Sequence, residues 1–419
     1  ERMNAIKSKI YTLLRRSETI FKTDMIYLVK GGSWLGLSQI ITIATGFGLS
    51  LAFTNLLSPE TYGIYKYVLS IVSLLLITTL NGVDSAVTQS VARGFDGTLA
   101  LGVRTKIKWG LFGSLGSVGV ATYYYIQGNT VLAIAFIISA FFIPFIESFD
   151  LYNALLNGKK LFKKFSNWNS IKKIIPTGLL ITTLYLTSNL FIILSVYFLS
   201  ALILNIWFFK KTTNDLLSNN LIDPDSMSFG KHLSVLNILS TLATELDKIL
   251  VFHYLGAVQL AVYTIALAPV DQIKGILKNL NALAFPKFAE QKTIAIKETL
   301  AKKTTLLTIG SSVIIGVYII LAPLFFKLFF PKYIESVIYS QVLAFTLIGA
   351  IISGFLYTIL EARAHTKGLS FFNISTNILN LTILFPLVYY FGIWGAIGAR
   401  GVSRFTSAIV AYLLVQRMD

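Results

Sequence analysis

Apolar residues are concentrated in twelve stretches along the chain, each long enough to cross a membrane as an α-helix. A crossing takes about twenty residues, because the hydrocarbon core is about 30 Å thick and a helix rises about 1.5 Å per residue. The alternating pattern of a membrane β-barrel is not seen in the sequence. The stretches are residues 28–54, 62–84, 104–126, 130–153, 166–187, 190–209, 232–254, 257–285, 304–327, 336–361, 368–391 and 393–416. We therefore predict an all-α integral membrane protein with about twelve transmembrane helices.

A polar interruption at residues 210–231 divides the stretches into two sets of six. We interpret it as a cytoplasmic linker between an N-terminal lobe, residues 28–209, and a C-terminal lobe, residues 232–419. The two sets repeat one another, since residues 151–156 resemble residues 356–360. Six helices return the chain to its starting side, so the repeat predicts two bundles related by a pseudo-twofold axis along the membrane normal. Two such bundles would give alternating access to a cavity between them.

Residues 1–27 precede the first stretch and mix apolar with basic side chains. Leu13 and Leu14, for example, lie close to Lys9, Arg15 and Arg16. This pattern predicts an amphipathic helix on the anionic surface of the inner leaflet, with membrane lipids as partners. A basic leader without fixed structure is an equally good interpretation. A cleavable signal peptide is not indicated, because the segment is polar and basic.

Composition agrees with a membrane protein. The chain is 55% hydrophobic and 13% charged, with a mean hydropathy of +0.71, which excludes an ordinary soluble domain. It contains no cysteine, so disulfides and thiolate metal sites are excluded, and its three histidines show no metal-ligand spacing. We expect neither a metal site nor a cofactor.

The net charge of +17 is explained by the loops. With the N-terminus inside, the inner segments hold 28 lysines and arginines and the outer loops hold only Lys327 and Lys332. Basic loops favour the cytoplasmic side, so we predict a multi-pass protein of the cytoplasmic (inner) membrane with both termini in the cytoplasm. Nucleic-acid binding is not needed to explain the basicity.

Charged residues at the depth of the hydrocarbon core are the main candidates for function, because each costs a few kcal/mol unless it is paired or hydrated. The cations are Lys66, Lys248, Lys274, Lys278, Arg400 and Arg404, and the acids are Glu245, Asp247 and Asp271. Six cations against three acids suggest a cationic central cavity for an anionic substrate such as a phosphate or pyrophosphate headgroup.

Arg400 and Arg404 are the best candidates for binding phosphate, because they lie one helical turn apart and a guanidinium binds phosphate oxygens in pairs. Two alternatives remain open. The charges neutralise one another as interhelical pairs, for instance between the arginines and the seventh stretch, or Lys66 extends to the outer interface. Glu245, Asp247 and Asp271 are also candidates for binding a coupling ion, H⁺ or Na⁺.

Catalysis finds little support in the sequence. No serine or threonine stands out beside a histidine and a carboxylate, and the phosphate-binding loop of an ATPase is not found. We therefore expect a protein that is not an enzyme.

Several short motifs, in order, point to a family. They are residues 57–65 (Leu-Ser-Pro-Glu-Thr-Tyr-Gly-Ile-Tyr), 82–86 (Gly-Val-Asp-Ser-Ala), Asp247-Lys248, Leu255-Gly256 followed by Tyr263, and 392–396 (Gly-Ile-Trp-Gly-Ala). With these, the chain resembles the polysaccharide transporters (Wzx-type flippases) of the multidrug/oligosaccharidyl-lipid/polysaccharide (MOP) exporter superfamily.

The resemblance implies the MATE-like MOP fold and a role in O-antigen or other polysaccharide biosynthesis. The implied substrate is an undecaprenyl- or dolichyl-pyrophosphate-linked oligosaccharide, flipped from the inner to the outer leaflet, and polysaccharide assembly proteins are implied partners. Lys248 matches the Asp-basic motif of the family.

Three alternatives remain. A lipid II flippase belongs to the same superfamily. A cation-coupled drug exporter of that superfamily typically has an acid in its first helix, and residues 28–54 contain none. A membrane-bound polysaccharide polymerase or glycosyltransferase is more distant, because it usually needs a large outer loop.

Overall fold

The computed structural model describes residues 25–290, 293–363 and 365–418, and within these ranges the regular structure is entirely helical. Most of the predicted amphipathic segment, residues 1–24, lies outside the described residues. The first half contains α2 (Met25–Leu56), α3 (Pro59–Leu75), the short η1 (Leu76–Thr79), α4 (Gly82–Ala92), α5 (Thr98–Ile126), α6 (Thr130–Phe149), α7 (Tyr152–Gly158), α8 (Phe162–Leu186) and α9 (Leu190–Leu216). The second half contains α10 (Ser226–Leu255), α11 (Ala257–Glu290), α12 (Thr293–Phe329), η2 (Pro331–Tyr333), α13 (Ser336–Ala362) and α14 (Thr366–Gln416).

The fold class predicted from the apolar stretches is confirmed. The second stretch is built from α3, η1 and α4, and the fourth from α6 and α7. The eleventh and twelfth are joined as α14, which breaks at Gly392, where φ is +58°. Glycine suits this break because side chains with a Cβ rarely adopt a positive φ.

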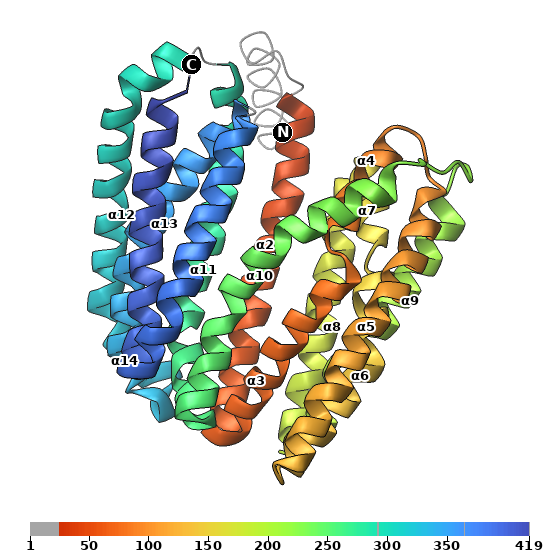
Figure 1. Cartoon of the computed structure of the whole chain (residues 1–419), viewed down its shortest axis with the longest axis vertical. Coiled ribbons are helices and arrows are strands. Elements are labelled where there is room, and N and C mark those ends of the chain that lie inside the picture. Colours follow the sequence, from red (N-terminus) through yellow and green to blue (C-terminus); the bar gives the residue numbers. More distant parts are fainter. Residues whose placement is uncertain (1–24, 291–292, 364, 419) are drawn as a thin grey trace, which may run out of the picture.

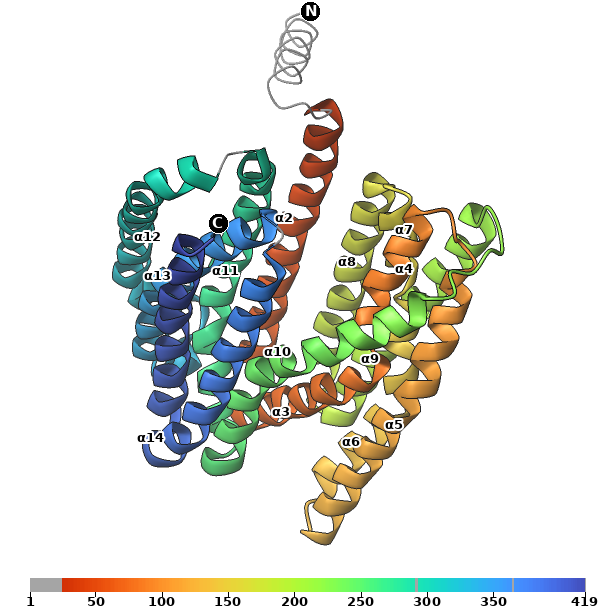
Figure 2. The same ribbon diagram turned by 45° about the horizontal axis from the view of Figure 1, so that its top comes forward.

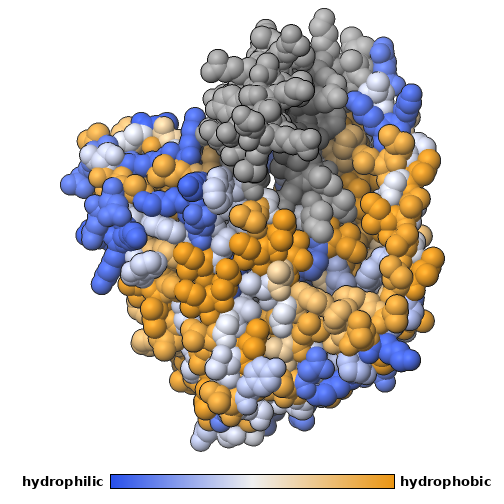
Figure 3. Space-filling model, turned by 180° about the vertical axis from the view of Figure 1, so that it is seen from behind, coloured by the Kyte–Doolittle hydropathy of each residue, from blue (hydrophilic) through white to orange (hydrophobic). Residues whose placement is uncertain are grey.

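Seven of the described helices are long and apolar enough to cross a membrane by length and composition. Others carry more charge, as α10 does with Glu245, Asp247 and Lys248. On the face seen in Figure 3, hydrophobic residues form a broad band, with hydrophilic residues mainly above and below it. Outward-facing apolar side chains such as Leu115, Leu186 and Ile320 are more than half exposed. The bilayer is the solvent that suits such a surface.

The helices form two bundles with three helices between them. Figure 1 shows α11 to α14 on one side and α4 to α9 on the other, with α2, α3 and α10 in the middle; Figure 2 shows the same separation after rotation. α2 packs on α8, while α10 contacts α4 and α3 of the first half and α11 and α14 of the second. We call the side that carries residues 217–225 the linker side; the start of α2 and the end of α14 lie there too (Figure 1).

The two halves meet closely on the side opposite the linker. α3 begins with an N-cap at Ser58, whose Oγ accepts from the Thr61 amide at 3.1 Å, followed by Pro59 at the first turn. A Cβ at Gly63 would lie 1.8 Å from the carbonyl oxygen of Ala257, so only glycine fits here. The start of α3 thus packs backbone to backbone against the start of α11.

The segment between α9 and α10 is extended and bound to the first half. It is shorter than predicted, since α9 continues to Leu216 and α10 begins at Ser226. The Asp223 carboxylate accepts from the Ser90 hydroxyl at 2.7 Å and pairs with Arg93. The hydrogen bond from Ser90 lowers the pKa of Asp223 below its usual value, and the Asp225 amide and the Arg93 charge lower it further. Nearby, Asp96 pairs with Lys159 at 2.6 Å.

Candidate functional site

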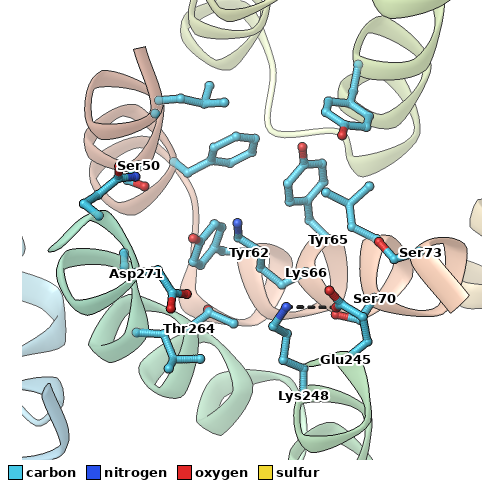
Figure 4. Close-up of a pocket in the computed structure, with 18 residues that line it drawn as sticks. Ser50, Tyr62, Tyr65, Lys66, Ser70, Ser73, Glu245, Lys248, Thr264 and Asp271 are labelled. Carbon is cyan, nitrogen blue, oxygen red and sulfur yellow. Dashed lines mark hydrogen bonds and ion pairs between the residues drawn. The ribbon is translucent and has the colours of Figure 1, made fainter. Parts of the chain in front are cut away.

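A cavity of about 410 Å³ lies between the two halves. Its walls come from α2 and α3 of the first half and from α10 and α11 of the second, and Tyr197 of α9 also lines it. Figure 4 shows Tyr62, Tyr65 and Lys66 projecting from α3 into this space, opposite Glu245, Lys248 and Asp271. The cavity lies toward the side opposite the linker, because it is lined by Tyr62, which is next to the contact of Gly63 with Ala257.

One polar stripe of α3 forms much of the wall. Tyr62, Lys66, Ser70 and Ser73 follow one another at intervals of three or four residues, so they share one face of the helix. The Lys66 ammonium lies 5.4 Å from the centre of the Tyr62 ring. Among the described residues, no carboxylate is within ion-pair distance of Lys66. It is therefore a cavity cation with room for a ligand.

The opposite wall carries both acids and a lysine. Lys248 Nζ donates to Glu245 Oε2 at 2.8 Å, one turn apart on α10, and both side chains are mostly buried. Asp271 faces them from α11. Of the described residues that line the cavity, two are cations and two are acids. The described part of the lining is thus charge-balanced, whereas the sequence predicted a surplus of cations.

Arg400 is one of the predicted cavity cations that do not line the cavity, because it pairs with Asp247. Arg400 Nε donates to Asp247 Oδ2 at 2.5 Å, and the Tyr263 hydroxyl donates to the same oxygen at 2.5 Å. The Asp247 side chain is 1% exposed. The group joins α10, α11 and α14 inside the second half, away from the cavity lining. This arrangement matches the alternative of a pair between Arg400 and the seventh stretch.

Arg404 and Lys274 are also not among the residues that line the cavity. Arg404 donates to the Thr346 hydroxyl at 2.6 Å and to the Leu343 carbonyl at 3.3 Å, so it bonds to α13. Lys274 is exposed one turn beyond Asp271 on α11 and is not part of the described lining. The side chain of Lys278 lies outside the described residues. Phosphate binding by these basic residues stays a prediction.

Sequence reasoning missed the uncharged part of the lining. Tyr65 stacks on Phe53 with ring centres 4.6 Å apart, and hydroxyls come from Ser50, Ser70 and Thr264. Aromatic faces next to hydroxyls and carboxylates suit sugar rings. The signal was present in the three- and four-residue spacing of polar residues from Tyr62 to Ser73.

Acids near the linker side of the first half are paired with lysines. Asp84 accepts from Lys106 at 2.6 Å, and Asp150 pairs with Lys172. Within the described residues, no group of three or more acids or histidines is placed to hold a metal ion.

Comparison with known proteins identifies the fold and the family. The sequence profile of polysaccharide biosynthesis proteins matches residues 28–292. No curated protein sequence matches the chain. Two of the similar solved structures show a multidrug resistance MATE family transporter of the MOP superfamily. The inward-facing one is 13% identical, with a TM-score of 0.61, over 90% of this chain and 93% of that one. The outward-facing one is 13% identical, with a TM-score of 0.53, over 92% and 94%.

A third structure, MATE in complex with MaD5, is 14% identical with a TM-score of 0.62, over 92% of this chain and 95% of that one. At such identities the likeness shows a common fold. The profile match, in contrast, covers more than half of the chain and confirms the family indicated by the short motifs. The chain therefore belongs to the polysaccharide biosynthesis protein family, as a multi-pass membrane protein with a MATE-like fold.

Proposed function

We propose that the protein is a flippase that moves a polyprenyl-pyrophosphate-linked oligosaccharide across the membrane by alternating access. The observation that supports this most is the cavity between the halves, in which aromatic rings and hydroxyls lie with Lys66, a lysine that pairs with no carboxylate of the described residues. Its volume of about 410 Å³ is in the range of small-ligand sites, about 300–1,000 Å³. It would take the pyrophosphate and the first sugars while the polyprenyl chain stays in the bilayer.

In this proposal Lys66 is the first cation to bind phosphate. Lys248 is held by Glu245 at 2.8 Å, and Arg400 is held by Asp247, so their charges are already compensated. Tyr62 and Tyr65 line the cavity but are 1% and 2% exposed, so they would contact sugars once the halves move apart, with Ser70 and Thr264 as hydrogen-bonding partners. Arg404, Lys274 and Lys278 would contribute when the halves move.

The direction follows from the loop charges. Since basic loops favour the cytoplasm, we propose that the linker side faces the cytoplasm of the inner membrane and that the lipid-linked sugar moves outward. Glu245 and Asp271 are the candidates for binding a coupling H⁺ or Na⁺, because they line the cavity.

A cation-coupled exporter of small molecules is the second candidate. It is favoured by Glu245 and Asp271, since two carboxylates in the lining suit a cationic drug, and by the multidrug transporters that share the fold. The two candidates differ in the charge of the substrate: Lys66 would bind the anionic pyrophosphate of a lipid-linked sugar, whereas Glu245 and Asp271 would bind a cationic drug.

The test is a flipping assay in proteoliposomes, with an undecaprenyl-pyrophosphate-linked disaccharide that carries a fluorophore on the sugar. Lys66→Gln should weaken its apparent affinity by about tenfold or more, because a hydrogen bond from a charged group contributes about 1.5–3 kcal/mol. The matched control is Lys327→Gln, which removes an exposed lysine of α12 away from the cavity.

Equal transport by wild type and Lys66→Gln, with the probe flipped by both, would exclude the role of Lys66. Absence of flipping by wild type, together with export of a cationic dye that is lost in Asp271→Asn, would favour the drug exporter instead.

A further inference from the structure

Four tryptophans of the described chain carry a lysine ammonium over the ring. Lys163 lies 5.2 Å from the centre of the Trp34 ring, and Lys164 lies 5.3 Å from that of Trp168. The other pairs are Lys211 with Trp207 at 5.3 Å and Lys231 with Trp109 at 5.9 Å. Each tryptophan lies in the linker-side half of its helix. Together they mark the level of the membrane interface on that side, where tryptophan and basic residues gather.

The pair of Lys231 and Trp109 differs from the others, because it joins helices from the two halves of the chain. Trp109 belongs to α5, and Lys231 lies in the second turn of α10. Arg104 and Lys108, both exposed, add two more cations one turn apart on α5, next to Trp109. α5 carries no acidic residue. Three cations thus lie near the linker-side ends of α5 and α10.

Exposed apolar side chains continue from these cations toward the middle of the helices. Phe112 and Leu115 on α5 are 57% and 66% exposed, and Val235 on α10 is 63% exposed. Along α5, the distance from Arg104 to Leu115 is about 16 Å at about 1.5 Å per residue. One leaflet of hydrocarbon is about 15 Å thick, half of the core. This face of α5 and α10 is therefore basic at one end and apolar beyond it, and the length from Arg104 to Leu115 is about the thickness of one leaflet of hydrocarbon.

We propose that this face of α5 and α10 binds an anionic phospholipid of the linker-side leaflet. The phosphate would contact Lys231, Arg104 and Lys108, while one acyl chain would lie along Phe112 and Leu115. The stack on Trp109 holds the Lys231 ammonium at the depth of the headgroups. The face is distinct from the cavity, which none of these residues line.

The position of α10 gives this lipid a structural role. α10 begins against α4 of the first half, where Gly230 packs on Val83, and it also contacts α3 of the first half and α11 and α14 of the second. A phospholipid held by both α5 and α10 stabilises the docking of α10 on the first half. The inference depends only on the membrane location, so it stands whether or not the substrate is a lipid-linked sugar.

The test uses the purified full-length chain in detergent, titrated with phosphatidylglycerol or with phosphatidylcholine. The readouts are the midpoint of thermal unfolding and the lipid adducts retained in native mass spectrometry. We expect phosphatidylglycerol to stabilise the wild type more than phosphatidylcholine does. Lys231→Gln should raise the phosphatidylglycerol concentration that gives half of the maximal stabilisation. We expect a change of about fivefold, because the variant loses one basic contact near a membrane surface.

Lys327→Gln is again the matched control, because it removes one exposed charge from the other end of the molecule. Unfolding in phosphatidylcholine alone shows that Lys231→Gln still folds. The proposal is overturned if both lipids stabilise the wild type equally. It is also overturned if Lys231→Gln and Lys327→Gln bind phosphatidylglycerol alike, which would mean general attraction to a basic protein.

Discussion

Lys332 holds the two halves together on the side opposite the linker. Its ammonium donates to the carbonyls of Asn55 at 2.8 Å and Leu57 at 3.3 Å, which are at and just beyond the end of α2. The Asn55 amide in turn reaches the Phe329 carbonyl at 3.5 Å. A cation at the C-terminal end of a helix also interacts favourably with the helix dipole. We predict that Lys332→Gln opens this side of the molecule.

The size of the effect follows from the contacts. Two hydrogen bonds from a charged group would contribute about 3 kcal/mol or more if buried, but Lys332 is exposed and solvent screens its charge. We therefore expect about 1–1.5 kcal/mol. That corresponds to a shift of roughly tenfold in the equilibrium between the closed and open states.

The assay benefits from the absence of native cysteines. Cysteines placed at the exposed Glu60 and Val258, at the starts of α3 and α11, accept spin labels at these two sites only. Electron spin resonance then measures the distance across the contact of Gly63 with Ala257. Lys332→Gln should increase the population of long distances about tenfold, while Lys327→Gln should leave the distribution as in the wild type. An unchanged distribution in Lys332→Gln would refute the role of Lys332 in holding the two halves together.

Two further predictions concern stability. Asp247→Asn leaves Arg400 buried without its partner, so it should lower the free energy of unfolding by about 3–5 kcal/mol. Thermal unfolding followed by tryptophan fluorescence measures this loss, and an unchanged midpoint would contradict it. Asp223 has a pKa below its usual value, so its contribution is present above the unfolded pKa of about 4 and is lost as the pH falls through the lower folded value. Hydrogen exchange of residues 217–225 should therefore accelerate at acidic pH in the wild type, beyond the intrinsic change, but not in Asp223→Asn.

The elements were predictable because their signals are local. Long apolar stretches predict helices wherever they occur. The apolar residues place the start of α3 at residue 62, whereas the helix begins at Pro59, capped by Ser58. The family was also recognisable, because its motifs lie at turns such as Gly392. These features depend on neighbours along the chain, which a sequence displays directly.

The site was only partly predictable, because depth in the membrane does not determine which way a side chain points. Asp247 and Lys248 are adjacent, yet Asp247 faces Arg400 inside the second half and Lys248 lines the cavity. Successive residues on a helix are about 100° apart, so the packing of α10 decides between the two. The role of Lys332 also depends on the end of α2, 275 residues earlier in the chain.

The equal numbers of lysines and carboxylates among the described residues of the cavity lining bear on how transport would be powered. With Lys66 and Lys248 balanced by Glu245 and Asp271, the described lining would move no net charge if the empty protein reorients by the proposed alternating access. A pyrophosphate-linked substrate would add about two negative charges, and each charge crossing 100 mV corresponds to about 2.3 kcal/mol of electrical work. An interior-negative voltage would then drive the outward movement of the substrate-bound protein. It would leave the return of the empty protein unaffected. Flux measured against an imposed potassium diffusion potential would show this as a dependence on voltage at limiting substrate.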